Sequence, residues 1–190
     1  PTTLNALWIE NRTGIWESFY LQSNIGSGVY CLYDESLCKY HVFSVRTGQQ
    51  VWESEPITEP WASFNWQWWI AYGILFTSGY DGHVRAYNAT TGEVIWDYFF
   101  GSAGYENAYG TCPVYSGFNI ADGKVYITND EHSPDSIPWR GGQLWCFDAY
   151  AGECLWSISG KLRNGAISSG YFTALNSLDG QIYTFGKGPS

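Results

Sequence analysis

Carboxylates gather in one stretch of the chain, residues 129–142, which is also rich in Pro, Ser and Gly. Asp130, Glu131 and Asp135 offer the oxygen ligands that calcium prefers in proteins. Their spacing does not match an EF-hand loop, and nothing in the sequence makes the three side chains converge. The stretch therefore favours a solvated acidic loop, with a metal site as the alternative.

The same stretch carries two residues of the types that contribute most to protein interfaces, Trp139 and Arg140. Long loops in compact folds are commonly functional. We therefore predict an interaction loop here. The alternative is that Trp139 only packs the loop against the domain.

Five cysteines allow two disulfides and leave one thiol. Two pairs flank predicted hairpin turns: Cys31 with Cys38, and Cys146 with Cys154. Cross-strand side chains approach to about 4.5–5.5 Å, which is near the span of a disulfide. Both pairs are candidate disulfides, and the alternative is that they are small buried hydrophobic side chains. Zinc explains the cysteines poorly, because the chain has no C-x-x-C pair and its three histidines are scattered.

Two sequons for N-glycosylation begin at Asn11 and Asn88, each in a predicted turn between outer strands. Together with the candidate disulfides they predict an extracytoplasmic protein, secreted or on the cell surface. The repeat described next favours Asn or Asp, then Ala, then Thr at this turn. The second sequon can therefore be a by-product of the repeat.

A glycine followed four residues later by a tryptophan recurs three times: Gly48 with Trp52, Gly92 with Trp96, and Gly152 with Trp156. The tryptophans are 44 and 60 residues apart, and the 129–142 stretch accounts for most of the longer interval. Periods of about 40–50 residues are typical of propeller blades.

The middle copy shows the elements that such a repeat needs. Residues 74–96 contain an apolar run, an Asp81-Gly82 turn, an alternating strand, a turn at Gly92 and a strand ending in Trp96. Asp-Gly between two strand-like runs favours a tight hairpin, because both residues tolerate positive φ. The run 66–72 supplies a fourth strand. We predict an all-β fold, a β-propeller of four-stranded antiparallel blades.

About four blades fit into the chain as one domain: a partial blade at 6–17, blades at 18–53, 61–97 and 107–157, and a partial blade at 164–186. An open fan of blades would leave unpaired strand edges. The sequence therefore favours a fragment of a larger propeller. The alternative is half of a ring that a second copy completes.

The Gly-to-Trp phrase resembles the tryptophan-docking repeat of the quinoprotein (PQQ-like) β-propellers, and the resemblance spans about residues 6–186. That family holds both quinone-cofactor dehydrogenases and non-catalytic scaffold propellers. It implies that each repeat tryptophan packs between neighbouring blades, near the repeat glycine. For a dehydrogenase it also implies a pocket for pyrroloquinoline quinone with calcium, a catalytic carboxylate and a basic partner, and no position here matches them.

The resemblance therefore favours a non-catalytic scaffold, without catalytic residues or cofactor, that binds a protein or a cell-surface glycan. The alternative is a fragment of a dehydrogenase dependent on pyrroloquinoline quinone and calcium, whose active-site residues lie in missing blades.

Composition excludes two classes of partner. The formal net charge is −9 and no cluster of Lys or Arg occurs, so nucleic-acid binding is not expected. No apolar stretch of about 20 residues is present to span a membrane. Aromatic residues are densest at 61–69, where Trp66 and Trp68 share one face of a predicted strand. Packing between blades is the favoured explanation, and a platform for carbohydrate or peptide is the alternative.

Overall fold

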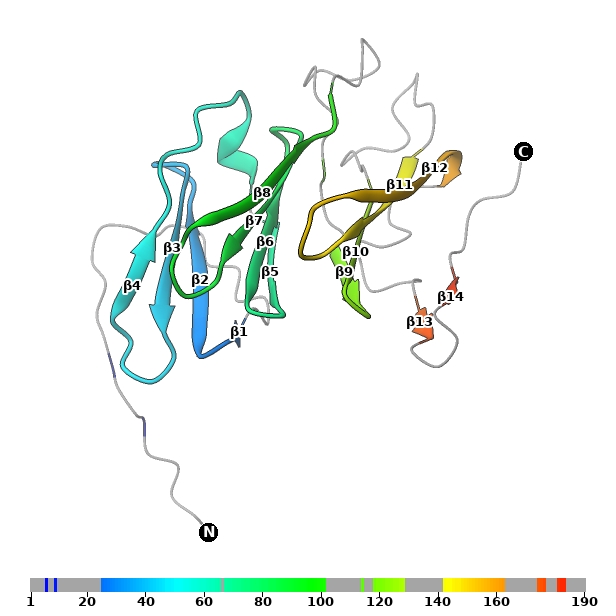
Figure 1. The fold of residues 1–190 in the computed structure, drawn as a ribbon. Coiled ribbons are helices and arrows are strands. Elements are labelled where there is room, and N and C mark those ends of the chain that lie inside the picture. Colours follow the sequence, from blue (N-terminus) through cyan, green and yellow to red (C-terminus); the bar gives the residue numbers. More distant parts are fainter. Residues whose placement is uncertain are drawn as a thin grey trace.

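The computed structural model describes residues 6, 9, 25–65, 67–101, 114, 118–128, 142–162, 174–176 and 181–183. They form three four-stranded antiparallel sheets, one two-stranded sheet and one turn of 3-10 helix, η1 (Ala62–Phe64) (Figure 1). The first sheet contains β1 (Ile25–Gly26), β2 (Val29–Asp34), β3 (Lys39–Ser44) and β4 (Gln50–Glu53). The second contains β5 (Gln67–Ala71), β6 (Ile74–Ser78), β7 (His83–Asn88) and β8 (Val94–Phe99). The third contains β9 (Phe118–Ala121), β10 (Lys124–Thr128), β11 (Gly142–Asp148) and β12 (Cys154–Leu162), and the small sheet pairs β13 (Ala174–Asn176) with β14 (Gln181–Tyr183).

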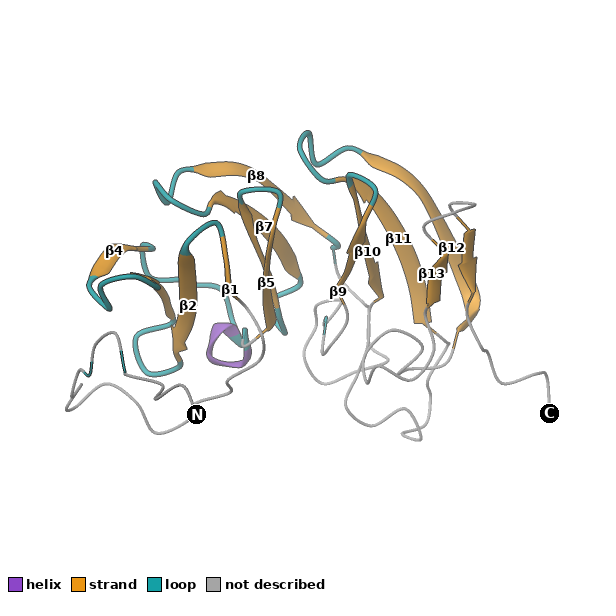
Figure 2. Ribbon diagram, turned by 90° about the horizontal axis from the view of Figure 1, so that it is seen from below, coloured by secondary structure: helices purple, strands orange, loops and turns teal. Residues whose placement is uncertain are grey.

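The three large sheets follow one another like the blades of a fan (Figures 1 and 2). Within each sheet the strands lie in chain order. The first strands of successive sheets are neighbours, because β1 contacts β5 and β5 contacts β9. This arrangement confirms the predicted all-β fold with four-stranded antiparallel blades. The blade limits themselves stay a prediction.

Apolar side chains fill the spaces between the sheets. Tyr40, Val42 and Leu75 are buried between the first and second sheets. Phe76 and Phe147 are buried between the second and third. Both faces of the second sheet are therefore covered, which explains why all five residues of β6 are buried.

A β-bulge occurs at the same place in each of the three four-stranded sheets, between the third and fourth strands. Phe43, Tyr87 and Phe147 on the third strands each have a partner on the fourth strand. One extra residue lies between that partner and the repeat tryptophan. Trp52, Trp96 and Trp156 consequently lie opposite Val42, Ala86 and Cys146. Bulges re-aim the side chains beside them, so the repeated bulge gives the three tryptophans an equivalent placement.

The turn before each fourth strand is closed by a polar side chain. Asn88 Oδ1 accepts hydrogen bonds from the backbone N–H groups of Thr90 and Thr91, at 3.0 and 3.1 Å. Asp148 Oδ1 does the same for Tyr150 and Ala151, at 2.9 and 2.8 Å. Asn and Asp favour such turns because their short side chains reach the backbone two or three residues on.

The Asp148 turn is expected to weaken in acid. Backbone N–H groups of Ala151 and Tyr150 hold the pKa of Asp148 below its ordinary value. A carboxylate with a lowered pKa stabilises the fold above its unfolded pKa of about 3.9 and loses that contribution as the pH falls through its folded pKa. We expect the D148N variant to lose less stability than the natural chain between about pH 5 and pH 3. Urea unfolding at each pH measures this, and equal losses would contradict it.

The four cysteines considered for disulfides are free thiols in the structure. Cys146 and Cys154 lie on adjacent strands as predicted, β11 and β12, but not directly opposite each other, and Cys38 does not lie on a strand. Cys31 lies opposite Val42, and Cys38 lies in the turn before β3. Cys146 lies opposite Trp156, whereas Cys154 lies opposite Phe147. The registers set by the two turns, Asp34 opposite Lys39 and Phe147 opposite Cys154, determine these placements. Disulfide formation therefore stays a prediction.

Candidate functional site

Each docked tryptophan joins two blades. The Trp52 indole donates its Nε1–H to the Ala89 carbonyl oxygen, and Trp96 donates to that of Ala149, both at 3.0 Å. The rings cover Gly92 and Gly152, where an added Cβ would lie 2.7 Å from Trp52 Cδ2 and 2.5 Å from Trp96 Cγ. These glycines also have φ of 79° and 69°. Glycine is required on both counts.

One surface of the molecule brings together three connecting segments. These are the β2–β3 turn (35–38), the segment 54–65 between β4 and β5, and the β6–β7 turn (79–82). The Ile57 N–H donates to the Cys38 carbonyl oxygen at 2.9 Å, and the Tyr33 hydroxyl donates to the Ala62 carbonyl oxygen. The Phe64 and Tyr80 rings lie 5.7 Å apart. We call the exposed residues of 35–38 and 54–65 the linker face; the β6–β7 turn (79–82) itself is buried.

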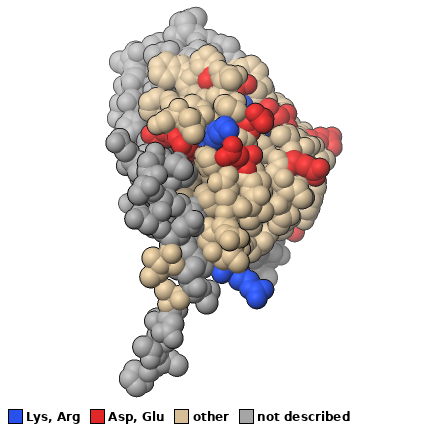
Figure 3. All heavy atoms as spheres, turned by 90° about the vertical axis from the view of Figure 1, so that its left-hand side faces the viewer, with Lys and Arg blue, Asp and Glu red and all other residues tan. Residues whose placement is uncertain are grey.

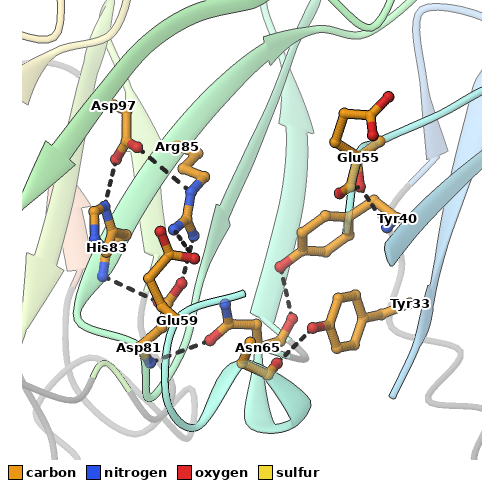
Figure 4. A network of polar contacts seen from close by, with 11 residues as sticks. Tyr33, Tyr40, Glu55, Glu59, Asn65, Asp81, His83, Arg85 and Asp97 are labelled. Atoms are coloured by element: carbon orange, nitrogen blue, oxygen red, sulfur yellow. Dashed lines mark hydrogen bonds and ion pairs between the residues drawn. The ribbon is translucent and has the colours of Figure 1, made fainter. Parts of the chain in front are cut away.

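Beneath the linker face lies a buried charge cluster centred on Arg85 of β7 (Figure 4). Arg85 Nη1 contacts Asp81 Oδ2 at 2.6 Å, Nη2 lies 3.6 Å from Glu59 Oε2, and Nε lies 3.5 Å from Asp97 Oδ2. The Asp81 side chain is fully buried and that of Arg85 is 7% exposed. Burial disfavours the charged guanidinium, but Asp81 outweighs this effect and raises the pKa of Arg85.

The same cluster fixes the turn residues around it. Asp81 Oδ1 accepts the backbone N–H of His83 at 3.1 Å, and Asp97 Oδ1 contacts His83 Nδ1 at 2.7 Å. Asp97 directly follows the docking residue Trp96 on β8. The cluster therefore ties the linker face to the same outer strand that joins the second and third blades.

The first blade repeats part of this pattern. Glu53 follows Trp52 as Asp97 follows Trp96, and it contacts Lys39 Nζ at 2.8 Å and His41 Nδ1 at 3.4 Å. Burial lowers the pKa of His41. The hydrogen bond from Lys39 lowers the pKa of Glu53. The buried carboxylate near this copy is Asp34, whose charge opposes the lowering of the His41 pKa.

Two tyrosines anchor the segment 54–65 from below (Figure 4). The Tyr40 hydroxyl donates to the Asn65 carbonyl oxygen at 2.6 Å, and the Tyr33 hydroxyl donates to that of Ala62. Burial raises the pKa of both tyrosines, so both hydroxyls remain protonated donors. Asn65 Oδ1 in turn accepts the Asp81 N–H at 3.3 Å. The linker is consequently held by buried side chains of both adjoining blades.

An aromatic pair projects from this linker. Trp61 and Phe64 are 39% and 42% exposed, and their ring centroids lie 6.2 Å apart. The Trp61 backbone has φ of 70°, a left-handed conformation that a bulky residue rarely adopts. Such conformations persist only where the surrounding structure fixes them, and they cluster at functional sites.

Several residues selected from the sequence lie outside the described part of the chain. They are Asn11 and the loop residues Asp130, Glu131, Asp135, Trp139 and Arg140. Of the described segments, none places three or more His, Cys, Asp or Glu side chains where they could hold a metal ion. None of the described helices is long and apolar enough to cross a membrane.

The Arg85 cluster could not be selected from the sequence. Asp81 has the type and position of a turn residue, and Glu59 lies between two predicted blades without a motif of its own. The one available signal was the isolated Arg85 in an otherwise apolar and aromatic strand pair, because a cation in a buried strand requires carboxylate partners.

Comparison with known proteins agrees with this architecture. A PQQ-like family model described as outer membrane protein assembly factor BamB matches residues 40–187. The chain belongs to this PQQ-like repeat family. A curated relative, polyvinylalcohol dehydrogenase of Sphingopyxis sp. (strain 113P3), is 30% identical over 44% of this chain and 15% of its own length.

Solved structures share the fold of this PQQ-like chain. Quinohemoprotein alcohol dehydrogenase ADHIIG from Pseudomonas putida HK5 matches with a TM-score of 0.56 and 18% identity, over 73% of this chain and 20% of that one. The computationally designed Ika4 protein matches with a TM-score of 0.55 and 12% identity, over 87% and 89% of the two chains. The match thus spans a fifth or less of these two dehydrogenases, 15% of one and 20% of the other.

Proposed function

We propose that this PQQ-like chain is a non-catalytic propeller scaffold that binds another protein outside the cytoplasm. The observation that carries the proposal is the exposed pair Trp61 and Phe64 on a linker anchored by buried hydrogen bonds. Exposed tryptophan is enriched among the residues that dominate binding energy. A linker that is already ordered loses little conformational freedom when a partner binds.

The matched family description supports the proposed location and role, because it names an outer membrane protein assembly factor. The two sequons, at Asn11 and Asn88, agree with a secreted or cell-surface protein. Asn88 is partly exposed, and its Oδ1 closes the turn. A glycan on the Asn88 side-chain nitrogen would have to leave the hydrogen bonds of Asn88 Oδ1 to the turn intact.

A second copy of the chain is a further candidate partner. Trp156 is 38% exposed, whereas the docked Trp96 is 9% exposed. A second copy that supplies a neighbouring blade would bury the exposed part of Trp156. Sedimentation of the intact chain tests this: a dimer that buries Trp156 supports ring completion by a second copy, and a monomer contradicts it.

The alternative function is a piece of a dehydrogenase that uses pyrroloquinoline quinone with calcium, and the identity to polyvinylalcohol dehydrogenase favours it. The described carboxylate cluster does not fit that cofactor pair. Asp81, Glu59 and Asp97 already surround the Arg85 guanidinium, which occupies the position that a divalent cation would need. We therefore assign no catalytic step to these residues.

A cofactor titration separates the two functions. Pyrroloquinoline quinone is added to the full chain with and without calcium, while absorbance and the reduction of a redox dye by alcohols are recorded. A scaffold gives neither saturable binding nor turnover. Tight, calcium-dependent binding with dye reduction would replace the scaffold with the dehydrogenase.

A further inference from the structure

The linker face has a chemical character that indicates what kind of partner it binds. Three apolar side chains are exposed on it: Trp61 and Phe64 beside η1, and Leu37, 55% exposed, in the β2–β3 turn. The bond from Ile57 N–H to the Cys38 carbonyl oxygen holds that turn against the linker. The three side chains therefore belong to one surface.

Carboxylates border these apolar side chains. Glu59 lies in the same tight turn as Trp61, because the Ala62 N–H donates to the Glu59 carbonyl oxygen at 3.2 Å. Its side chain is 41% exposed. Glu55 on the linker is also exposed, and Glu35 in the β2–β3 turn is half-buried. The linker face thus combines an aromatic centre with an acidic border.

Among the described residues, one cation meets this border, because Arg85 Nη2 lies 3.6 Å from Glu59 Oε2. Arg85 is buried and surrounded by carboxylates, and Lys39 is engaged with Glu53. Within the described residues, segments 35–38, 54–65 and 79–82 contain no Lys or Arg. The wider surface agrees, because acidic side chains are more widespread than basic ones on the face drawn in Figure 3.

We propose that the linker face binds a cationic peptide segment of a partner protein, one that alternates basic and apolar side chains. The apolar side chains would pack on Trp61 and Phe64. The ammonium or guanidinium groups would lie near Glu35, Glu55 and Glu59 and over the Trp61 ring, since cations are attracted to an indole face. This proposal rests on the scaffold function and specifies its partner.

Complementary charge mainly affects the association rate and the choice of partner, whereas buried aromatic anchors determine how long a complex lasts. The aromatic centre and the acidic border of the linker face are therefore expected to affect peptide binding differently. Removing an aromatic ring should weaken binding at any salt concentration. Removing carboxylates should weaken it mostly at low salt, where charges interact over about 30 Å at 0.01 M rather than about 8 Å at 0.15 M.

The test uses the full chain and three fluorescein-labelled peptides, measured by fluorescence anisotropy. The first alternates lysine with leucine and phenylalanine, and the other two carry glutamate or serine in place of lysine. Maltoheptaose serves as the glycan probe. The variants are W61A and F64A for the rings and the E35Q/E55Q double variant for the border. Y150A and E153Q are the matched controls, because Tyr150 and Glu153 are exposed in a turn outside the linker face.

We expect the lysine peptide to bind at least about tenfold more tightly than the glutamate peptide, and W61A or F64A to weaken it by about tenfold or more. E35Q/E55Q should weaken it by a few fold at low salt only, and the two controls by less than about twofold. Thermal unfolding of W61A and of W61G, which relieves the positive φ, distinguishes lost contacts from lost structure.

Equal binding of the lysine and glutamate peptides, or no loss in W61A, would overturn the proposal. Tight, Trp61-dependent binding of the serine peptide would overturn the cationic partner and leave the protein scaffold intact. Binding of maltoheptaose in place of the peptides would overturn the peptide class. The scaffold function is tested separately, because dye reduction in the presence of pyrroloquinoline quinone would contradict it whichever peptide binds.

Discussion

Replacing Gly152 by alanine is expected to lower the free energy of unfolding by about 2–5 kcal/mol. Two effects add. The backbone at Gly152 has φ of 69°, a conformation that costs an L-residue about 1–2 kcal/mol. The new Cβ would also lie 2.5 Å from Trp96 Cγ, and forced overpacking typically costs about 1–3 kcal/mol.

Gly73 provides the matched control for this substitution. Its φ is 76°, yet a Cβ there would have no neighbour within 4 Å. G73A should therefore show the backbone cost alone, about 1–2 kcal/mol. Urea unfolding followed by tryptophan fluorescence measures both variants. Equal losses in G73A and G152A would mean that the indole does not require glycine beneath it.

The other half of the contact is Trp96, which is 9% exposed and bonded to the Ala149 carbonyl oxygen. W96A is expected to cost about 3–5 kcal/mol, as is usual when a buried aromatic side chain is removed. In the W96A/G152A double variant the clash disappears with the ring. The double variant should thus be more stable than the sum of the single losses predicts, and strict additivity would contradict direct contact between the two positions.

The features that the sequence predicts correctly are those determined by neighbouring residues. The hairpin around Asp81-Gly82 and the Gly-to-Trp phrase define strands within one blade, and the blade fold follows from their repetition. The tight turn predicted there is wrong in detail, because the turn spans 79–82 and has positive φ at Gly82 but not at Asp81. The disulfide pairs illustrate the limit of this reasoning. Cys31 and Cys38 are near in sequence, but a four-residue turn and the register of β2 against β3 place Val42, not Cys38, opposite Cys31.

The linker face was harder to predict because it is assembled between blades. Tyr33 of β2 reaches Ala62, and Arg85 of β7 reaches Glu59, although each residue alone fits an ordinary strand or linker. Trp61 stood out only as part of an aromatic segment, for which packing was the favoured explanation. Its exposure follows from its left-handed backbone and the short helix after it, neither of which has a strong local signal in this sequence.

Replacing Arg85 by leucine is expected to destabilise the chain by about 3–5 kcal/mol, because it leaves the fully buried Asp81 carboxylate without its cation. Added salt should not restore stability, since buried charges are poorly screened. The R46L variant is the control, because Arg46 is exposed, and its loss should stay within about 0.5 kcal/mol.

The D81N/R85L double variant decides whether the loss comes from an unpaired charge or from lost packing. The asparagine side chain in D81N would keep an oxygen for the His83 N–H but would carry no charge. If the unpaired carboxylate is the cause, the double variant should recover most of the stability that R85L loses, because removing both charges of a buried pair is often nearly neutral. No recovery would show that the Arg85 side chain acts mainly through its contacts with Glu59 and Asp97. In that case the linker at Glu59 would be released, and R85L should weaken peptide binding at Trp61 even at temperatures where the blades remain folded.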